Sequence, residues 1–63
     1  MITVKDFIDL NFGDRFSLNK HDTDEEIMVN VPGHKITQSK YAMLPVKGFF
    51  ANPKHLDLIE IFI

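Results

Sequence analysis

The hydrophobic pattern of residues 56–63 sets the expectation for the whole fold. Successive side chains of an extended strand point to opposite faces of a sheet. This alternation gives one face with Leu56, Leu58, Glu60 and Phe62, and an opposite face with Asp57, Ile59, Ile61 and Ile63. Because both faces are mostly apolar, the pattern predicts a strand that is covered on both sides or lies near the middle of the sheet.

The opening segment predicts an N-terminal helix that begins after Thr3. Thr3 carries a side chain typical of an N-cap, and Asp6 stands at the acidic position of a capping box. Three apolar side chains follow at helical spacing: Val4, Phe7 and Ile8. Gly13 is placed to end the helix. A helix this short does not persist alone in water, so its apolar stripe has to pack on a sheet.

From Asp14 onward the pattern changes to the period of two that is typical of strands. Phe16 and Leu18 alternate with polar residues in a first strand that ends at residue 19, and residues 27–31 predict a second strand rich in β-branched side chains. The polar residues 20–25 predict the hairpin loop between the two strands. Pro32-Gly33 fits a type II turn, in which the glycine has a positive φ.

The second half of the chain predicts a short helical turn and another hairpin. Residues 34–36 indicate a short strand or a connector, and residues 37–44 a single helical turn that ends before Pro45. Residues 46–51 predict a third strand, in which Gly48 marks a bulge or a close backbone approach. A turn at 52–55 joins it to the terminal strand as a hairpin. We therefore expect a single small α+β domain over residues 1–63, with one N-terminal helix packed on a four-stranded, mostly antiparallel sheet.

Length and composition indicate a small core without covalent support. A single core in a chain of 63 residues rarely supplies more than about 3 to 5 kcal/mol. The sequence contains no cysteine, which excludes disulfides and cysteine-based zinc sites. The hydrophobic fraction of 44% argues against a disordered chain. A partner chain is the simplest remaining source of stability.

The charge pattern bears on the class of partner and on location. Seven basic and nine acidic residues give a net charge of −2, and the lysines are scattered. Nucleic-acid binding therefore lacks its usual basic face, and mimicry of DNA lacks the necessary acidity. The first residues have an acid where a signal peptide needs positive charge, and no run approaches the roughly 18 apolar residues of a membrane span. We expect a cytoplasmic protein.

The sequence shows no arrangement that is typical of a catalytic, cofactor or metal site. The acidic loop lacks the central glycine of a calcium-binding loop, and His21, His34 and His55 stand in or beside turns without zinc-ligand spacing. No glycine-flanked elbow surrounds a serine or threonine. We therefore expect a protein that is not an enzyme and that has no cofactor and no metal.

Aromatic and acidic residues are the candidates for partner binding. Phe49 and Phe50 are neighbours in a predicted strand and have to point to opposite faces, so one of them leaves the main core. That side chain is either shielded by the helical turn near Tyr41 or belongs to a patch that a partner covers. The candidate partner-binding residues are Asp22, Asp24, Glu25, Glu26, Tyr41 and Phe49.

Several segments together resemble those of a group of small proteins from mobile elements. They are the opening Thr3-Val4-Lys5-Asp6-Phe7-Ile8-Asp9-Leu10, the following hairpin, the Ser39-Lys40-Tyr41 turn, Val46 after a proline and the final Leu58-Ile59-Glu60-Ile61. In this pattern the chain resembles small accessory proteins of Gram-positive phages and conjugative elements. It departs from the pattern at Pro32-Gly33-His34, where a plainer hairpin is expected. The resemblance implies an accessory factor that binds a host or phage protein, as inhibitors of defence systems such as anti-CRISPR proteins do.

Three functions remain open from the sequence. The leading prediction is a non-catalytic accessory protein of a phage or mobile element that binds and modulates or inhibits a host protein. The second is a small nucleic-acid-associated protein that uses the cations Lys5, Arg15, Lys35, Lys40, Lys47 and Lys54. The third is a self-assembling structural protein, a homodimer formed through a sheet edge or the second face of the terminal strand.

Overall fold

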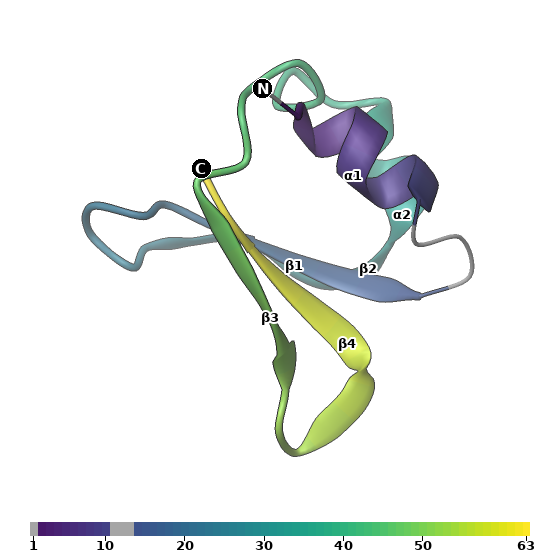
Figure 1. The fold of residues 1–63 in the computed structure, drawn as a ribbon, viewed down its shortest axis with the longest axis vertical. Helices are drawn as coiled ribbons and strands as arrows, with labels where there is room; N and C mark the ends of the chain where they lie inside the picture. Colours follow the sequence, from purple (N-terminus) through teal and green to yellow (C-terminus); the bar gives the residue numbers. More distant parts are fainter. Residues whose placement is uncertain (1, 11–13) are drawn as a thin grey trace.

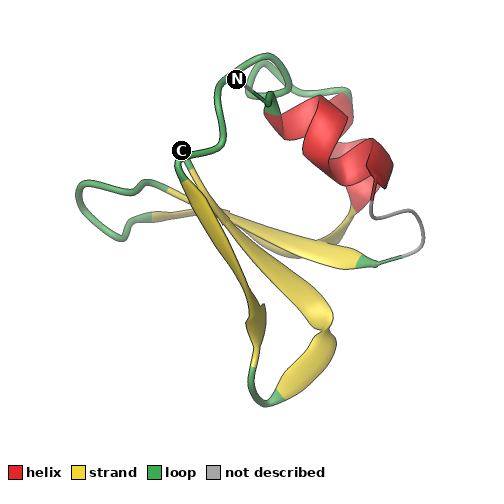
Figure 2. Ribbon diagram, viewed as in Figure 1, coloured by secondary structure: helices red, strands yellow, loops and turns green. Residues whose placement is uncertain are grey.

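The structure, a computed structural model, describes residues 2–10 and 14–63, with residue 56 described by its backbone alone. The helices are α1 (Val4–Leu10) and α2 (Gly33–Thr37), and the strands are β1 (Arg15–Asn19), β2 (Glu26–Pro32), β3 (Gly48–Asn52) and β4 (His55–Phe62). Both helices lie on one side of a strongly twisted sheet (Figure 1 and Figure 2). The expected α+β class and the N-terminal helix on a four-stranded sheet are confirmed.

The sheet has the strand order β2-β1-β4-β3. Both outer pairings are antiparallel, and they correspond to the two predicted hairpins. The central pairing, between β1 and β4, is parallel and aligns Phe16 with Ile59 and Leu18 with Ile61. The terminal strand is therefore an inner strand, which is one of the two arrangements that its apolar faces predicted.

Helix α1 begins as its sequence predicts. The backbone N–H of Asp6 donates a hydrogen bond to Thr3 Oγ1 over 3.2 Å, which is the bond expected of an N-cap. The apolar residues Val4, Phe7 and Ile8 are buried. The expected stop at Gly13 lies outside the described residues.

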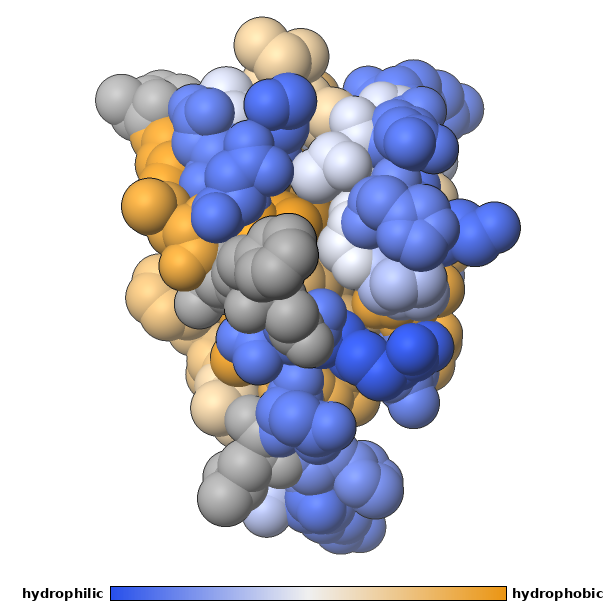
Figure 3. All heavy atoms as spheres, turned by 90° about the vertical axis from the view of Figure 1, so that its right-hand side faces the viewer, coloured by the Kyte–Doolittle hydropathy of each residue, from blue (hydrophilic) through white to orange (hydrophobic). Residues whose placement is uncertain are grey.

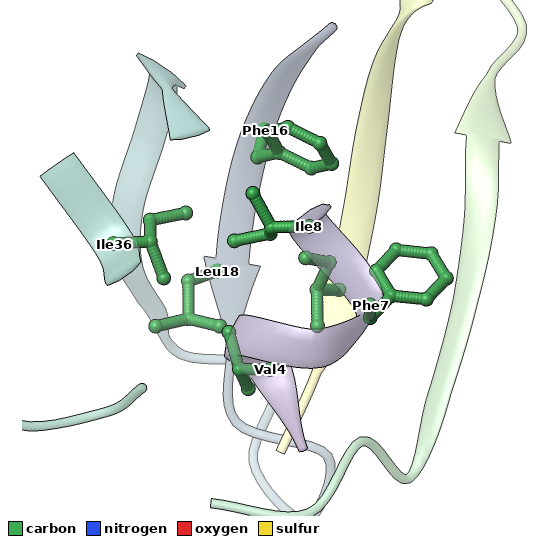
Figure 4. Close-up of a cluster of buried hydrophobic side chains, with 7 residues drawn as sticks. Val4, Phe7, Ile8, Phe16, Leu18 and Ile36 are labelled. Carbon is green, nitrogen blue, oxygen red and sulfur yellow. The ribbon is translucent and has the colours of Figure 1, made fainter. Parts of the chain in front are cut away.

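The core lies between the two helices and one face of the sheet. Its buried side chains come from both helices, β1 and β4: Val4, Phe7, Ile8, Phe16, Leu18, Ile36 and Ile61. Figure 4 shows Val4 and Ile8 of α1 on the side of Leu18 and Phe16, whereas Phe7 points toward β3. Segments that are far apart in sequence thus depend on each other for burial, which is the dominant favourable contribution to folding.

The type II turn expected at Pro32-Gly33 is wrong. Pro32 ends β2 in an extended conformation and precedes α2, whose first residue is Gly33. A Cβ atom at Gly33 would lie 2.7 Å from Ile8 Cγ2 and 3.3 Å from Phe16 Cε2. The glycine is therefore needed for the close approach of α2 to the core and not for a positive φ.

The second helix also lies elsewhere than predicted. It spans Gly33–Thr37, where a strand or connector was expected, while residues 38–44 form turns. The backbone N–H groups of Val4 and Lys5 donate hydrogen bonds to the carbonyls of Leu44 and Ala42, over 2.9 and 2.8 Å. The turns thus provide acceptors for the N-terminal amides of α1, which have no partner inside their own helix.

Candidate interaction surface

The face of the sheet opposite the helices, here called the open face, is only partly covered. The strand alignments place Ser17 beside Glu60 and Asn19 beside Phe62, with Phe50 of β3 opposite Glu60. A shallow cavity of about 440 Å³ lies on this face. The lining residues are Ser17, Asn19, Asp24, Glu26, Val29, Asn52, Leu58, Glu60 and Phe62. The second face of the terminal strand is therefore apolar at its ends and polar in the middle.

A carboxylate held by two amides forms the polar centre of the open face. Asn19 Nδ2 donates a hydrogen bond to Glu60 Oε1 over 3.0 Å, and Asn52 Nδ2 donates one to Glu60 Oε2 over 3.3 Å. Asn19 is buried and also lies 3.4 Å from the carbonyl of Ile61. Three strands are thereby connected through side chains. Because both carboxylate oxygens of Glu60 already accept hydrogen bonds from amides, we assign this network a structural role: it holds the three strands in register.

Strand β3 presents exposed aromatic rings on both faces of the sheet. Phe49 is 61% exposed and its ring packs on Phe7 at a centroid distance of 4.7 Å, on the helix side. Phe50 is 47% exposed and stacks on Phe62 at 5.6 Å, on the open face. The expectation that the two rings point to opposite faces is confirmed. The ring that packs against Phe49 is Phe7 and not Tyr41. Figure 3 shows that hydrophobic residues also reach the surface between polar ones on one side of the molecule.

The two edges of the sheet differ in how they are protected. In β2 the pairing shifts register, Asn30 has a φ of 51° and Pro32 ends the strand. The Arg15 guanidinium also donates hydrogen bonds to Asn30 Oδ1 and to the Asn30 carbonyl, each over 2.6 Å. Bulges, proline and charged side chains are the usual means of blocking an edge strand. Strand β3 has no proline and no charged side chain among Gly48–Asn52, and its pairing with β4 shifts register only at the end of the strand, after Ala51. The edge that β3 forms is therefore the less protected of the two.

Comparisons of this chain with protein-family models, with curated proteins and with solved structures found no match. The surface is therefore interpreted from its own geometry. Within residues 2–10 and 14–63, no three His, Asp or Glu side chains converge in a way that would hold a metal ion. The helices of the described chain are also too short and too polar to cross a membrane.

The predicted partner-binding residues do not form one patch. Asp22 and Tyr41 line a second, mostly apolar cavity of about 500 Å³, whereas Asp24 and Glu26 line the cavity of the open face. Glu25 Oε2 lies 3.3 Å from Lys20 Nζ in an exposed ion pair.

Phe49 belongs to neither cavity and lies on the β3 edge. Phe50 was missed as a candidate, although its place beside Phe49 in a strand was a sufficient signal. The amide network on Glu60 had no sequence signal, because it depends on the register of three strands.

The cations proposed for nucleic-acid binding are distributed over both sides of the sheet. Lys5 lies on α1, where the hydrogen bond and the charge of Asp9, 3.0 Å away, raise the pKa of Lys5. Arg15 lies on the open face and is engaged by Asn30. Lys40 Nζ lies 5.4 Å from the Tyr41 ring centroid. Three of these cations thus already have a partner within the fold.

Proposed function

We propose that this chain is a non-catalytic binding protein that acts by occupying a surface of another protein through its β3 edge. The observation that carries the proposal is the exposure of Phe49 and Phe50 on opposite faces of one edge strand. Aromatic side chains are enriched in protein interfaces, because they bury a large area and lose little conformational freedom on binding. A partner that pairs with this edge would cover both rings at once.

The setting we propose is an accessory protein of a phage or mobile element that modulates or inhibits a host protein in the cytoplasm. The support is the resemblance in the N-terminal segment and the terminal strand. Inhibition of a defence system, as by an anti-CRISPR protein, fits this mode of action, because occupation of a surface needs no catalytic group. The nucleic-acid alternative has less support, since Lys5 and Arg15 lie on opposite sides of the sheet.

The proposal is tested by capture with matched variants. Tagged wild-type protein and the double variant Phe49→Ser/Phe50→Ser are incubated with a lysate of a Gram-positive host. The retained proteins are then compared by quantitative mass spectrometry. The matched control is Leu10→Ser, which removes an apolar side chain that is 77% exposed on α1. Far-UV circular dichroism establishes that each variant is folded.

We expect at least one protein to be retained by the wild type and by Leu10→Ser and lost from the double variant. The reason is that the loss of both rings removes the apolar centre of the contact. Equal retention by all three proteins would contradict the role of β3. Retention of no specific protein from several lysates would contradict a protein-binding function.

A further inference from the structure

The flanks of β3 indicate the chemistry of the segment that pairs with it. Lys47 precedes the strand and Lys54 lies in the turn that follows it, and both side chains are exposed. Neither amine forms an ion pair within the part of the chain that the structure describes. Between them, residues 48–53 contain no charged side chain. The edge is therefore apolar in the middle and positive at both ends.

We propose that the β3 edge binds an extended segment of a partner protein that is apolar in its centre and carries an acidic residue at each end. The proposal rests on the proposed function and specifies its ligand. Addition of a strand to a free sheet edge uses backbone hydrogen bonds for affinity and alternate side chains for specificity. The free side of β3 supplies the backbone groups, and Phe49 and Phe50 cover the alternate side chains on the two faces.

Charge favours such a segment over a second copy of this chain. If two copies of β3 paired antiparallel about Phe50, Lys47 of each copy would come opposite Pro53 of the other and would gain no opposite charge. If they paired parallel in register, each lysine would face its own equivalent. Like charges across neighbouring strands destabilise the pairing, and opposite charges stabilise it. An acidic residue at each end satisfies both lysines in either strand direction.

The opposite edge of the sheet provides an internal control. Strand β2 has Glu26 and Pro32 at its ends, and Arg15 hydrogen-bonds to the Asn30 carbonyl within it. Proline and an occupied carbonyl remove backbone groups that an added strand would need. A ligand that adds to a sheet edge should therefore select β3 alone.

The test uses the full chain labelled with ¹⁵N and two synthetic peptides. The probe is Ac-Asp-Val-Thr-Val-Thr-Val-Thr-Asp-NH₂, whose acids are separated by as many residues as separate Lys47 from Lys54. The control peptide has Lys in place of both Asp residues. We expect amide shift changes at residues 47–52 and at Lys54, and none at residues 26–31. We also expect a Kd at least about tenfold lower for the acidic peptide, since two charge pairs change sign.

A charge-reversal variant makes the test independent of folding defects, because both substitutions are on exposed side chains. In Lys47→Glu/Lys54→Glu we expect the preference to reverse, with the lysine-ended peptide binding more tightly. Equal binding of both peptides to the wild type, an unchanged preference in the variant, or shifts at β2 would each overturn the proposal. A β3-mediated dimer in sedimentation equilibrium, lost in Phe50→Ser, would overturn it in favour of a second copy.

The peptide test and the capture experiment distinguish a failure of the inferred ligand chemistry from a failure of the proposed binding function. If a host protein is retained through Phe49 and Phe50 but the acidic peptide does not bind, the ligand chemistry inferred here is wrong and the binding function stands. If neither experiment detects binding, both are wrong.

Discussion

Replacing either of the two described glycines with alanine should change the stability of the protein, and the two changes should have opposite signs. At Gly33, a new Cβ would lie 2.7 Å from Ile8 Cγ2, a contact that requires an atom to move. Ile8 is buried on α1, and a β-branched side chain in a helix has one strongly preferred rotamer. Phe16 Cε2, 3.3 Å from the same position, limits movement on the other side. The substitution therefore overpacks the core.

The change in the free energy of unfolding for Gly33→Ala is the sum of two opposing contributions. Overpacking a well-packed core costs about 1 to 3 kcal/mol, whereas replacing a helical glycine with alanine gains about 0.5 to 1 kcal/mol. We therefore expect Gly33→Ala to lower the free energy of unfolding by roughly 0.5 to 2 kcal/mol. For a domain of this size, this corresponds to a fall in Tm of about 4 to 8 °C per kcal/mol. At Gly48 a Cβ would meet nothing within 4 Å, so Gly48→Ala should instead raise stability by about 0.5 kcal/mol.

The assay is urea-induced unfolding followed by far-UV circular dichroism for the wild type, Gly33→Ala and Gly48→Ala. Midpoints at an unchanged slope report stability directly. The expected order of midpoints places Gly33→Ala below the wild type and Gly48→Ala above it. A Gly33→Ala midpoint equal to or above that of Gly48→Ala would refute the close approach of α2 to Ile8.

Four further substitutions test the core, the helix cap and the open face. Leu18→Ala removes a fully buried side chain and should lower the free energy of unfolding by about 2 to 5 kcal/mol. We therefore expect the circular dichroism spectrum of an unfolded chain. A cooperative melt at the wild-type Tm would contradict this expectation. Thr3→Ala removes the acceptor for the Asp6 amide and should lower the free energy of unfolding in urea by about 1 kcal/mol. Asn19→Ala should lower the free energy of unfolding by about 1.5 to 3 kcal/mol, because it removes the buried amide that donates a hydrogen bond to the Glu60 carboxylate. Asn52→Ala should cost less than Asn19→Ala, since it leaves the shorter bond in place, and the reverse order in the same titration would count against the network.

Local patterns were sufficient for most of the elements. The Thr3 cap predicted the start of α1, and alternation of apolar and polar residues predicted β1, β2 and the terminal hairpin. These features depend on residues close together in sequence, for which side-chain period and capping are direct physical constraints. The helix at Gly33–Thr37 was misplaced because its position depends on other segments. Gly33 has to pass close to Ile8, and the carbonyls of residues 42 and 44 are used by α1.

The interaction surface was predictable only in part. Two adjacent phenylalanines in a strand required one ring to leave the core, and this followed from strand geometry alone. Which edge of the sheet is less protected depends on the strand order and on the bulge at Asn30. Neither the strand order nor the bulge is indicated by a pattern among residues that are close together in the sequence.

The sequence by itself determined the α+β class and the two hairpins, because apolar periodicity has to be matched by burial. It also restricted the terminal strand to a position that is covered on both sides or near the middle of the sheet. Only the tertiary structure decided that β1 and β4 pair in parallel, that two amides hold Glu60 and that β3 is left as the open edge. These features arise from contacts between segments that are distant along the chain. Their energies depend on the register in which the segments meet, which no single segment encodes.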